Sequence, residues 1–176
     1  MANDLRGSVD GWDFKSYVLG MLFYRFISEN LTEYINRQER EAGTPDFDYA
    51  KLSDADAEFG RESLVAEKGL FIPPSELFVN IRANAKGNEN LNETLERVFK
   101  DIEGSAVGSA SEDDLKGLFD DLDVNSTRLG STVAKRNATL VKLLEAIGDL
   151  PLGDFSDNTI DIFGDAYEYL MGMYAS

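Results

Sequence analysis

Apolar residues recur every three or four positions between residues 12 and 43, which is the spacing of one face of an α-helix. Phe23 and Phe26 widen this face, so the first half of the segment predicts a central core helix that Gly43 and Pro45 end. Aromatic residues at these positions could stack on nucleic-acid bases, but helical spacing favours packing in the core. The regularly spaced positions are Phe14, Tyr17, Val18, Met21, Tyr24, Ile27, Leu31 and Tyr34.

The segment after this helix predicts two shorter helices separated by a rigid bend. The first ends at Gly69, and an extended stretch follows because Ile72 and Pro73 each precede a proline. Ser75 is expected to cap the second, which runs to about Ala85.

A clean amphipathic pattern follows over residues 88–104. Asn90 is expected to cap this helix, and Glu93, three residues later, would complete a capping box. The apolar stripe of the helix is Leu91, Leu95, Val98, Phe99 and Ile102.

The last third of the chain predicts a loop and three helices. Residues 104–114 are rich in Gly, Ser and Ala and predict a flexible loop, which a short acidic helix follows. The last long core helix lies within residues 127–148, and its apolar stripe is Leu140, Val141, Leu144 and Ile147.

A final amphipathic helix is expected over residues 160–176. The apolar positions that it would pack against a partner or a following domain are Tyr167, Leu170, Met171 and Tyr174.

No segment shows the alternation of apolar and polar residues that is typical of a strand. The predicted fold class is therefore all-α, an irregular bundle of about five to eight helices in a single domain over residues 1–176.

Composition narrows the possible functions. The 176 residues include no cysteine and no histidine, which excludes disulfides, thiol nucleophiles, imidazole bases and zinc held by these ligands. With 33 acidic and 17 basic residues the net charge is −16, so the chain as a whole should repel nucleic acid and anionic membranes. The sequence shows neither a signal peptide nor a membrane-spanning run, and we expect a cytoplasmic protein.

Three stretches that resemble chemical motifs fail when their spacing is checked. The glycines of "GSAVGSASEDD" lack the lysine and the preceding strand of a phosphate-binding loop. A calcium loop that began at Asp123 would need Gly and Glu where the chain has Arg128 and Ala134. In "FIPPSELF", Ile72 and Ser75 replace the acid or amide and the aromatic residue of an adenine-methylating motif. We therefore predict no catalytic, cofactor-binding or metal-ligating residue in this chain.

One stretch runs against the overall charge. Between Val124 and Ile147 the only acidic residue is Glu145, and the stretch has a net charge of +3. Its basic residues would either contact DNA phosphates or pair with the acidic residues at Asp113–Asp123. The candidate phosphate contacts are Arg128, Lys135, Arg136 and Lys142.

Four blocks, in this order, resemble one known family: "LRGSVDGWDFKSYVLGMLFYRFISENL", "GLFIPPSELF", "FDDLDVNSTRLGSTVAKRNATLVKLLEAIGDLPL" and "DIFGDAYEYLMGMYAS". The family is the N-terminal helical region of the modification (methyltransferase) subunits of type I restriction–modification systems. The resemblance covers the chain from Leu5 to Ser176.

The resemblance implies that the full-length subunit uses S-adenosylmethionine to methylate the N6 atom of adenine in double-stranded DNA. It also implies assembly with a specificity subunit, a second modification subunit and a restriction subunit. The glycine loop and the adenine-gripping motif of the family are missing here. We therefore expect residues 160–176 to lead into a methyltransferase domain that is not present. The fragment should need no cofactor of its own and should be inactive alone, serving DNA clamping and assembly.

Two other interpretations remain open. One is a stand-alone helical module that binds a partner helix, with no connection to a methyltransferase. The other is an acidic mimic of DNA, which the charge of −16 invites and the basic stretch at Arg128–Lys142 disfavours.

Overall fold

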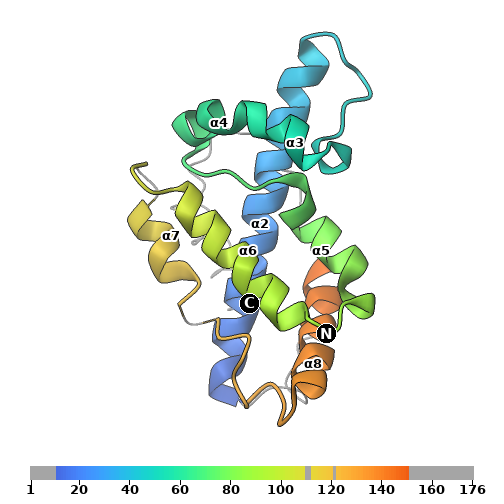
Figure 1. Ribbon diagram of the computed structural model, residues 1–176, viewed down its shortest axis with the longest axis vertical. Coiled ribbons are helices and arrows are strands. Elements are labelled where there is room, and N and C mark those ends of the chain that lie inside the picture. The colour runs from blue at the N-terminus through green and yellow to red at the C-terminus, as the bar shows by residue number, and fades with distance from the viewer. Residues whose placement is uncertain (1–10, 110–111, 121, 151–176) are drawn as a thin grey trace.

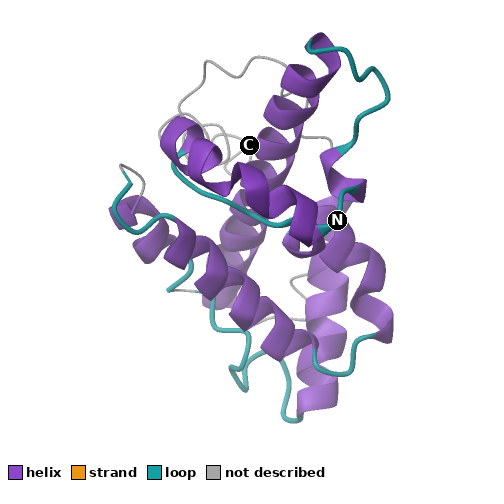
Figure 2. Ribbon diagram, turned by 45° about the horizontal axis from the view of Figure 1, so that its top comes forward, coloured by secondary structure: helices purple, strands orange, loops and turns teal. Residues whose placement is uncertain are grey.

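The computed structural model describes residues 11–109, 112–120 and 122–150, and every structural statement below concerns these residues. Their regular elements are all helical and none is a strand, so the predicted all-α class is confirmed (Figure 2). None of the described helices is long and apolar enough to cross a bilayer. The predicted helix over 160–176, with Tyr167, Leu170, Met171 and Tyr174, lies outside the described residues.

The described elements are α-helices joined by short 3-10 helices, labelled η. In chain order they are α2 (Gly11–Glu41), η1 (Tyr49–Lys51), α3 (Asp54–Ala57), η2 (Glu58–Gly60), α4 (Arg61–Lys68), η3 (Pro74–Glu76), α5 (Phe78–Asn84), η4 (Ala85–Gly87), α6 (Leu91–Ser105), α7 (Glu112–Leu118) and α8 (Val133–Gly148).

Helix α2 runs along the long axis of the molecule, and the other helices are arranged around it (Figure 1). Its 31 residues span about 46 Å at 1.5 Å per residue. It ends shortly before Gly43, as predicted, and this glycine has a φ of 116°, in the left-handed region. The four aromatic residues considered for base stacking, Tyr17, Phe23, Tyr24 and Phe26, are all buried in the core.

Tyr24 of α2 lies at the centre of the core and is fully buried. Its ring meets Phe78 of α5 and Phe99 of α6 edge to face, with centroid separations of 5.5 and 5.4 Å. Its hydroxyl donates to the backbone carbonyl of Glu76 in η3. Burial, followed by the Glu76 carboxyl, raises the pKa of Tyr24 well above its ordinary value, so this donor stays protonated. One side chain therefore joins α2 to η3, α5 and α6.

The start of α5 differs from the prediction. Ser75 does not cap a helix, because its amide and hydroxyl both bind the carboxylate of Asp54 within the loop that contains η3. Helix α5 begins three residues later at Phe78, whose amide donates to the hydroxyl of Ser28 on α2 at 3.2 Å. A side chain from another helix thus takes the place of the local cap.

The start of α6 differs in the same way. The helix begins directly after Asn90, as predicted, but the Asn90 side chain makes no capping hydrogen bond, so the predicted capping box with Glu93 does not form. Instead, Oδ1 of Asn137 on α8 accepts from the Asn92 amide at 3.0 Å. The Asn137 amide group donates to the Glu89 carbonyl at 2.8 Å. The cap of α6 is therefore a contact with α8.

The stripes predicted for the two long C-terminal helices are largely confirmed. All five predicted positions of α6 are buried. On α8, Leu140, Leu144 and Ile147 are buried, whereas Val141 is half-buried and Leu143 takes its place in the core.

We expect Asn137→Ala to lower the free energy of unfolding by about 1–3 kcal/mol, because it leaves the buried amide of Asn92 without an acceptor. Urea unfolding of this chain followed by circular dichroism would measure the loss. The matched control is Asn84→Ala, because Asn84 is exposed and its side chain bonds only within its own helix. A loss no larger than that of the control would contradict this account of the cap.

Candidate nucleic-acid interface

The predicted basic residues lie on α8 and on the loop that precedes it. Lys135 and Arg136 belong to the first turn of the helix, and Arg128 lies in the loop. Lys142 is seven residues after Lys135, so it lies on the same face about 10 Å further along the axis. Arg128, Lys135 and Lys142 are exposed, and Arg136 is half-buried.

The loop before α8 is firmly attached to the bundle. Its apolar residues Leu122, Val124 and Leu129 are buried. The Tyr17 hydroxyl donates to the Asp123 carbonyl at 2.6 Å, and the Thr139 hydroxyl donates to the Leu129 carbonyl at 2.7 Å. These bonds connect the loop to α2 and to α8, so the backbone that carries Arg128 has a defined position.

Gly130 brings this loop against the first turn of α8. A Cβ atom added at Gly130 would lie 2.7 Å from the backbone nitrogen of Arg136 and 2.7 Å from the carbonyl carbon of Lys135. The approach also allows the guanidinium of Arg136 to donate to the Gly130 carbonyl at 3.1 Å. Close packing therefore requires the absence of a side chain at residue 130.

The two ends of α8 use positive charge differently. At its C-terminus, Arg25 of α2 donates to the carbonyls of Ile147 and Leu150 at 2.7 and 2.6 Å. Arg82 of α5 pairs there with Glu145 and Asp149. Cations at this end match the negative pole of the helix dipole and stabilise the fold.

At the N-terminus of α8 the arrangement is reversed. Thr132 caps the helix by accepting from the Lys135 amide at 3.2 Å, and the first turn contains no acidic residue. Lys135 and Arg136 thus add positive charge to the positive pole, which is locally unfavourable for the helix. The combination of a helix N-terminus with lysine and arginine attracts an anion such as a phosphate.

The alternative of ion pairing within the chain is not supported for three of the four residues. Lys135, Arg136 and Lys142 form no ion pair with any described carboxylate. Lys135 reaches only the Ser131 hydroxyl, at 3.5 Å. The one acidic residue of the stretch, Glu145, is paired with Arg82. These three cations are therefore not used to neutralise Asp113–Asp123 within the described part of the chain.

Sequence reasoning missed a second polar feature, a cavity of about 320 Å³ that contains a buried carboxyl group. Glu76 is 7% exposed, and its Oε2 atom has no hydrogen-bond partner among the described residues. Burial, followed by the neighbouring Asp101 carboxylate, raises the pKa of Glu76 to about 8. The cavity is lined by Arg61, Phe71, Pro73, Glu76, Lys100, Asp101, Gly104 and Ser105.

The described residues contain no group of three or more acidic side chains able to hold a metal ion. No sequence signal pointed to Glu76, because its burial depends on the bend at Pro73 and Pro74 and on the packing of α6.

Comparison with known proteins gives consistent matches. A family model described as "HsdM N-terminal domain" matches residues 1–147. The type I restriction enzyme MpnII methylase subunit of Mycoplasma pneumoniae is 49% identical over 183 aligned residues, which cover 99% of this chain and 33% of that protein. The crystal structure of the type I restriction-modification system methyltransferase subunit from Streptococcus thermophilus matches with a TM-score of 0.71 and 29% identity. That match covers 99% of this chain and 36% of the other. The chain thus spans about a third of the length of these relatives.

We expect Gly130→Ala to lower the free energy of unfolding by about 1–3 kcal/mol, because the loop must move away from the backbone of α8. The control is Gly87→Ala, where an added Cβ would meet no atom within 4 Å. Equal unfolding midpoints for the two variants in urea would show that the loop does not depend on this close contact.

We expect Glu76→Gln to change the pH dependence of stability. In the unfolded chain Glu76 ionises near pH 4.5, but in the fold it keeps its proton up to about pH 8. Its contribution to stability is therefore complete below pH 4.5 and is lost as the pH rises to 8. The glutamine variant lacks this loss, so between pH 5 and pH 8.5 it should gain roughly 2–4 kcal/mol relative to the wild type.

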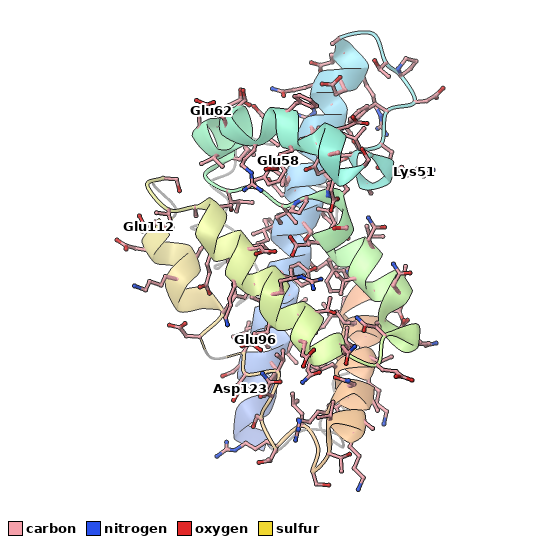
Figure 3. The ribbon with its side chains drawn as sticks, viewed as in Figure 1. Lys51, Glu58, Glu62, Glu96, Glu112 and Asp123 are labelled. Carbon is pink, nitrogen blue, oxygen red and sulfur yellow. The ribbon has the colours of Figure 1, made fainter. Side chains whose placement is uncertain are left out.

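Unfolding free energies from urea titrations at pH 5, 7 and 8.5 would measure this difference. The control is Glu62→Gln, an exposed position on α4 (Figure 3). Parallel pH profiles for the wild type and Glu76→Gln would refute the raised pKa.

Proposed function

This chain belongs to the HsdM N-terminal domain family, and from that premise we propose that, as the N-terminal domain of a type I restriction–modification methylase subunit, it holds DNA and partner subunits without catalysing methyl transfer. Methyl transfer from S-adenosylmethionine to the N6 atom of adenine then belongs to the remainder of the full-length subunit. The relatives above are about three times as long as this chain, which leaves room for such a domain.

The observation that supports a DNA contact most directly is the start of α8. Lys135 and Arg136 lie at the positive pole of the helix, no described carboxylate pairs with them, and Arg128 stands on the loop that packs against them. Lys142 extends the same charge along the helix face. Such groups contact the phosphate backbone, which positions a protein on DNA but does not read its sequence.

The rest of the surface is suited to protein contacts rather than DNA. The whole chain has a net charge of −16, so the field outside the α8 start opposes an approach by phosphates. We propose that the specificity subunit, the second modification subunit and the restriction subunit contact these acidic surfaces in the assembled complex. Double-stranded DNA would then be held only where the charge is reversed.

Membership of the HsdM N-terminal domain family removes the alternative of a helical module with no connection to a methylase. It also leaves no specific observation in favour of a DNA mimic, because the cations at the start of α8 would repel the basic groove of a DNA-binding enzyme.

The double variant Lys135→Glu/Arg136→Glu should weaken binding of duplex DNA by the assembled complex. If each residue neutralises one phosphate, the slope of log K against log salt should flatten by about 2, because each contact contributes roughly 0.9 to the slope. Fluorescence anisotropy with a labelled duplex at several salt concentrations would measure both effects.

The charge-matched control is Lys51→Glu/Lys86→Glu, since both lysines are exposed and lie on other elements. If the variant and this control reduce the slope equally, the effect is due to net charge and the α8 start is not a phosphate contact. An unchanged slope in the Lys135/Arg136 variant would leave subunit assembly as the role of this domain.

A further inference from the structure

We propose that the face formed by η2, η3 and the C-terminal half of α6 docks another protein subunit, which inserts a lysine or arginine side chain into the cavity at Glu76 and Asp101 and packs an apolar group on Phe59. This inference rests on the proposed function only for the choice of the subunits to be tested. Its physical basis is an exposed aromatic ring two residues along the chain from the lining of a cavity, in which one buried carboxyl oxygen has no hydrogen-bond partner among the described residues.

Phe59 is the most exposed large apolar side chain of the described residues. It lies in η2 and is 92% exposed. The other exposed large apolar side chains among the described residues are valines: Val79, Val107 and Val133. A ring this exposed would gain free energy from burial if a partner covered it. Glu58 and Glu62, on either side of it in the sequence, are both labelled in the upper part of the molecule in Figure 3.

The cavity is adjacent to Phe59 along the chain, because Arg61, two residues later, is part of its lining. Glu76 lines the same cavity and is more than nine-tenths buried, and its Oε2 atom makes no hydrogen bond to the described residues. Asp101 hydrogen-bonds to the Glu76 carboxyl group, and the Oε2 atom is left available to a further group. A volume of about 320 Å³ is sufficient for one long side chain.

The charges around the cavity favour a cation. The two cationic lining residues already have partners. Arg61 pairs with Glu58 at 2.7 Å, and its guanidinium lies 4.3 Å from the ring centre of Phe71. Lys100 pairs with Glu96 at 3.1 Å. Of the remaining groups that act on Glu76, Asp101 and Asp54 are acidic and Arg97 is basic. An ammonium or guanidinium group would therefore complete the charge balance, and it would bind carboxyl oxygens by charge-assisted hydrogen bonds.

The rim identifies a protein as the occupant rather than DNA. Four acidic residues within five positions of Phe59 in the sequence are exposed, and their charge would repel a phosphate backbone: Asp54, Asp56, Glu58 and Glu62. A subunit that itself binds DNA carries lysine and arginine on its surface, so it offers both the inserted cation and a basic rim that complements the acidic one.

Docking should be coupled to a proton. Glu76 is mainly protonated at neutral pH, and an inserted cation favours its ionised form. The complex therefore forms with release of a proton from Glu76, and its affinity should increase as the pH rises from 6 to 8. The groups that face Glu76 from neighbouring elements are Asp101, Arg97 and Lys100 of α6, Asp54 of α3 and Arg61 of α4.

The test uses the complete methylase subunit that contains this sequence, with the purified specificity subunit and the purified restriction subunit as separate probes. Isothermal titration calorimetry at pH 6.5 and pH 8 would measure each affinity. With the subunit that docks on this face, we expect Phe59→Ala and Glu76→Gln each to weaken binding by about tenfold or more, as interface anchors do. Glu76→Gln should also abolish the increase in affinity between pH 6.5 and pH 8.

The controls are Val107→Ala, an exposed apolar residue of another loop, and Glu62→Gln, which changes the same charge on the rim without reaching the cavity. Both should bind within about twofold of the wild type. Phe59 is almost fully exposed and Glu76→Gln is isosteric, so both variants are expected to fold, which circular dichroism would verify.

Wild-type affinity of Phe59→Ala and Glu76→Gln for both subunits would overturn the inference. It would also be overturned if the isolated wild-type subunit self-associates and Phe59→Ala makes it monomeric, because a second copy would then cover this face. Failure of the DNA contact is measured separately, by the salt slope of the Lys135/Arg136 variant, so the two proposals can fail independently.

Discussion

A helix that is apolar around most of its circumference is stable in water only when other elements enclose it, and α2 imposes this requirement on the whole bundle. Tyr24 shows the consequence most clearly, since its ring needs neighbours from α5 and α6 and its hydroxyl needs the Glu76 carbonyl. Polar residues of α2 serve the same purpose. Asn36 accepts from the Tyr49 amide and Ser28 accepts from the Phe78 amide, so the central helix provides acceptors for the first amides of η1 and α5.

The sequence predicts those features of this fold that depend on local periodicity. The buried faces of α2 and α6 follow from the spacing of apolar residues, and Gly69, with a φ of 86°, ends α4 where expected. Features that depend on contacts between distant residues were not predictable. The serine at residue 75 and the asparagine at residue 90 have the right chemistry for caps, but Ser28 and Asn137 perform that task from 50 and 45 residues away.

The candidate sites divide in the same way. The basic stretch was visible because a charge reversal can be counted along the chain, and the structure added that three of its cations remain without described carboxylate partners. Glu76 gave no such signal, because a single glutamate next to a serine that follows two prolines has an ordinary sequence context. Its raised pKa is a property of the enclosure that two prolines and α6 create. Figure 1 places the α4 and α8 ends of the bundle apart, so the two proposed contacts lie on different parts of the surface.

The anchoring of α8 has a mechanical consequence. Its C-terminal end is tied to α2 by two hydrogen bonds that Arg25 donates to the terminal carbonyls. It is tied to α5 by the ion pairs of Glu145 and Asp149 with Arg82. A force that bound DNA exerts on Lys135 would therefore be transmitted along α8 to α2 and α5, instead of detaching a surface segment. A helix that transmits force in this way would let a small number of phosphate contacts hold the domain in place while neighbouring parts of a larger assembly move.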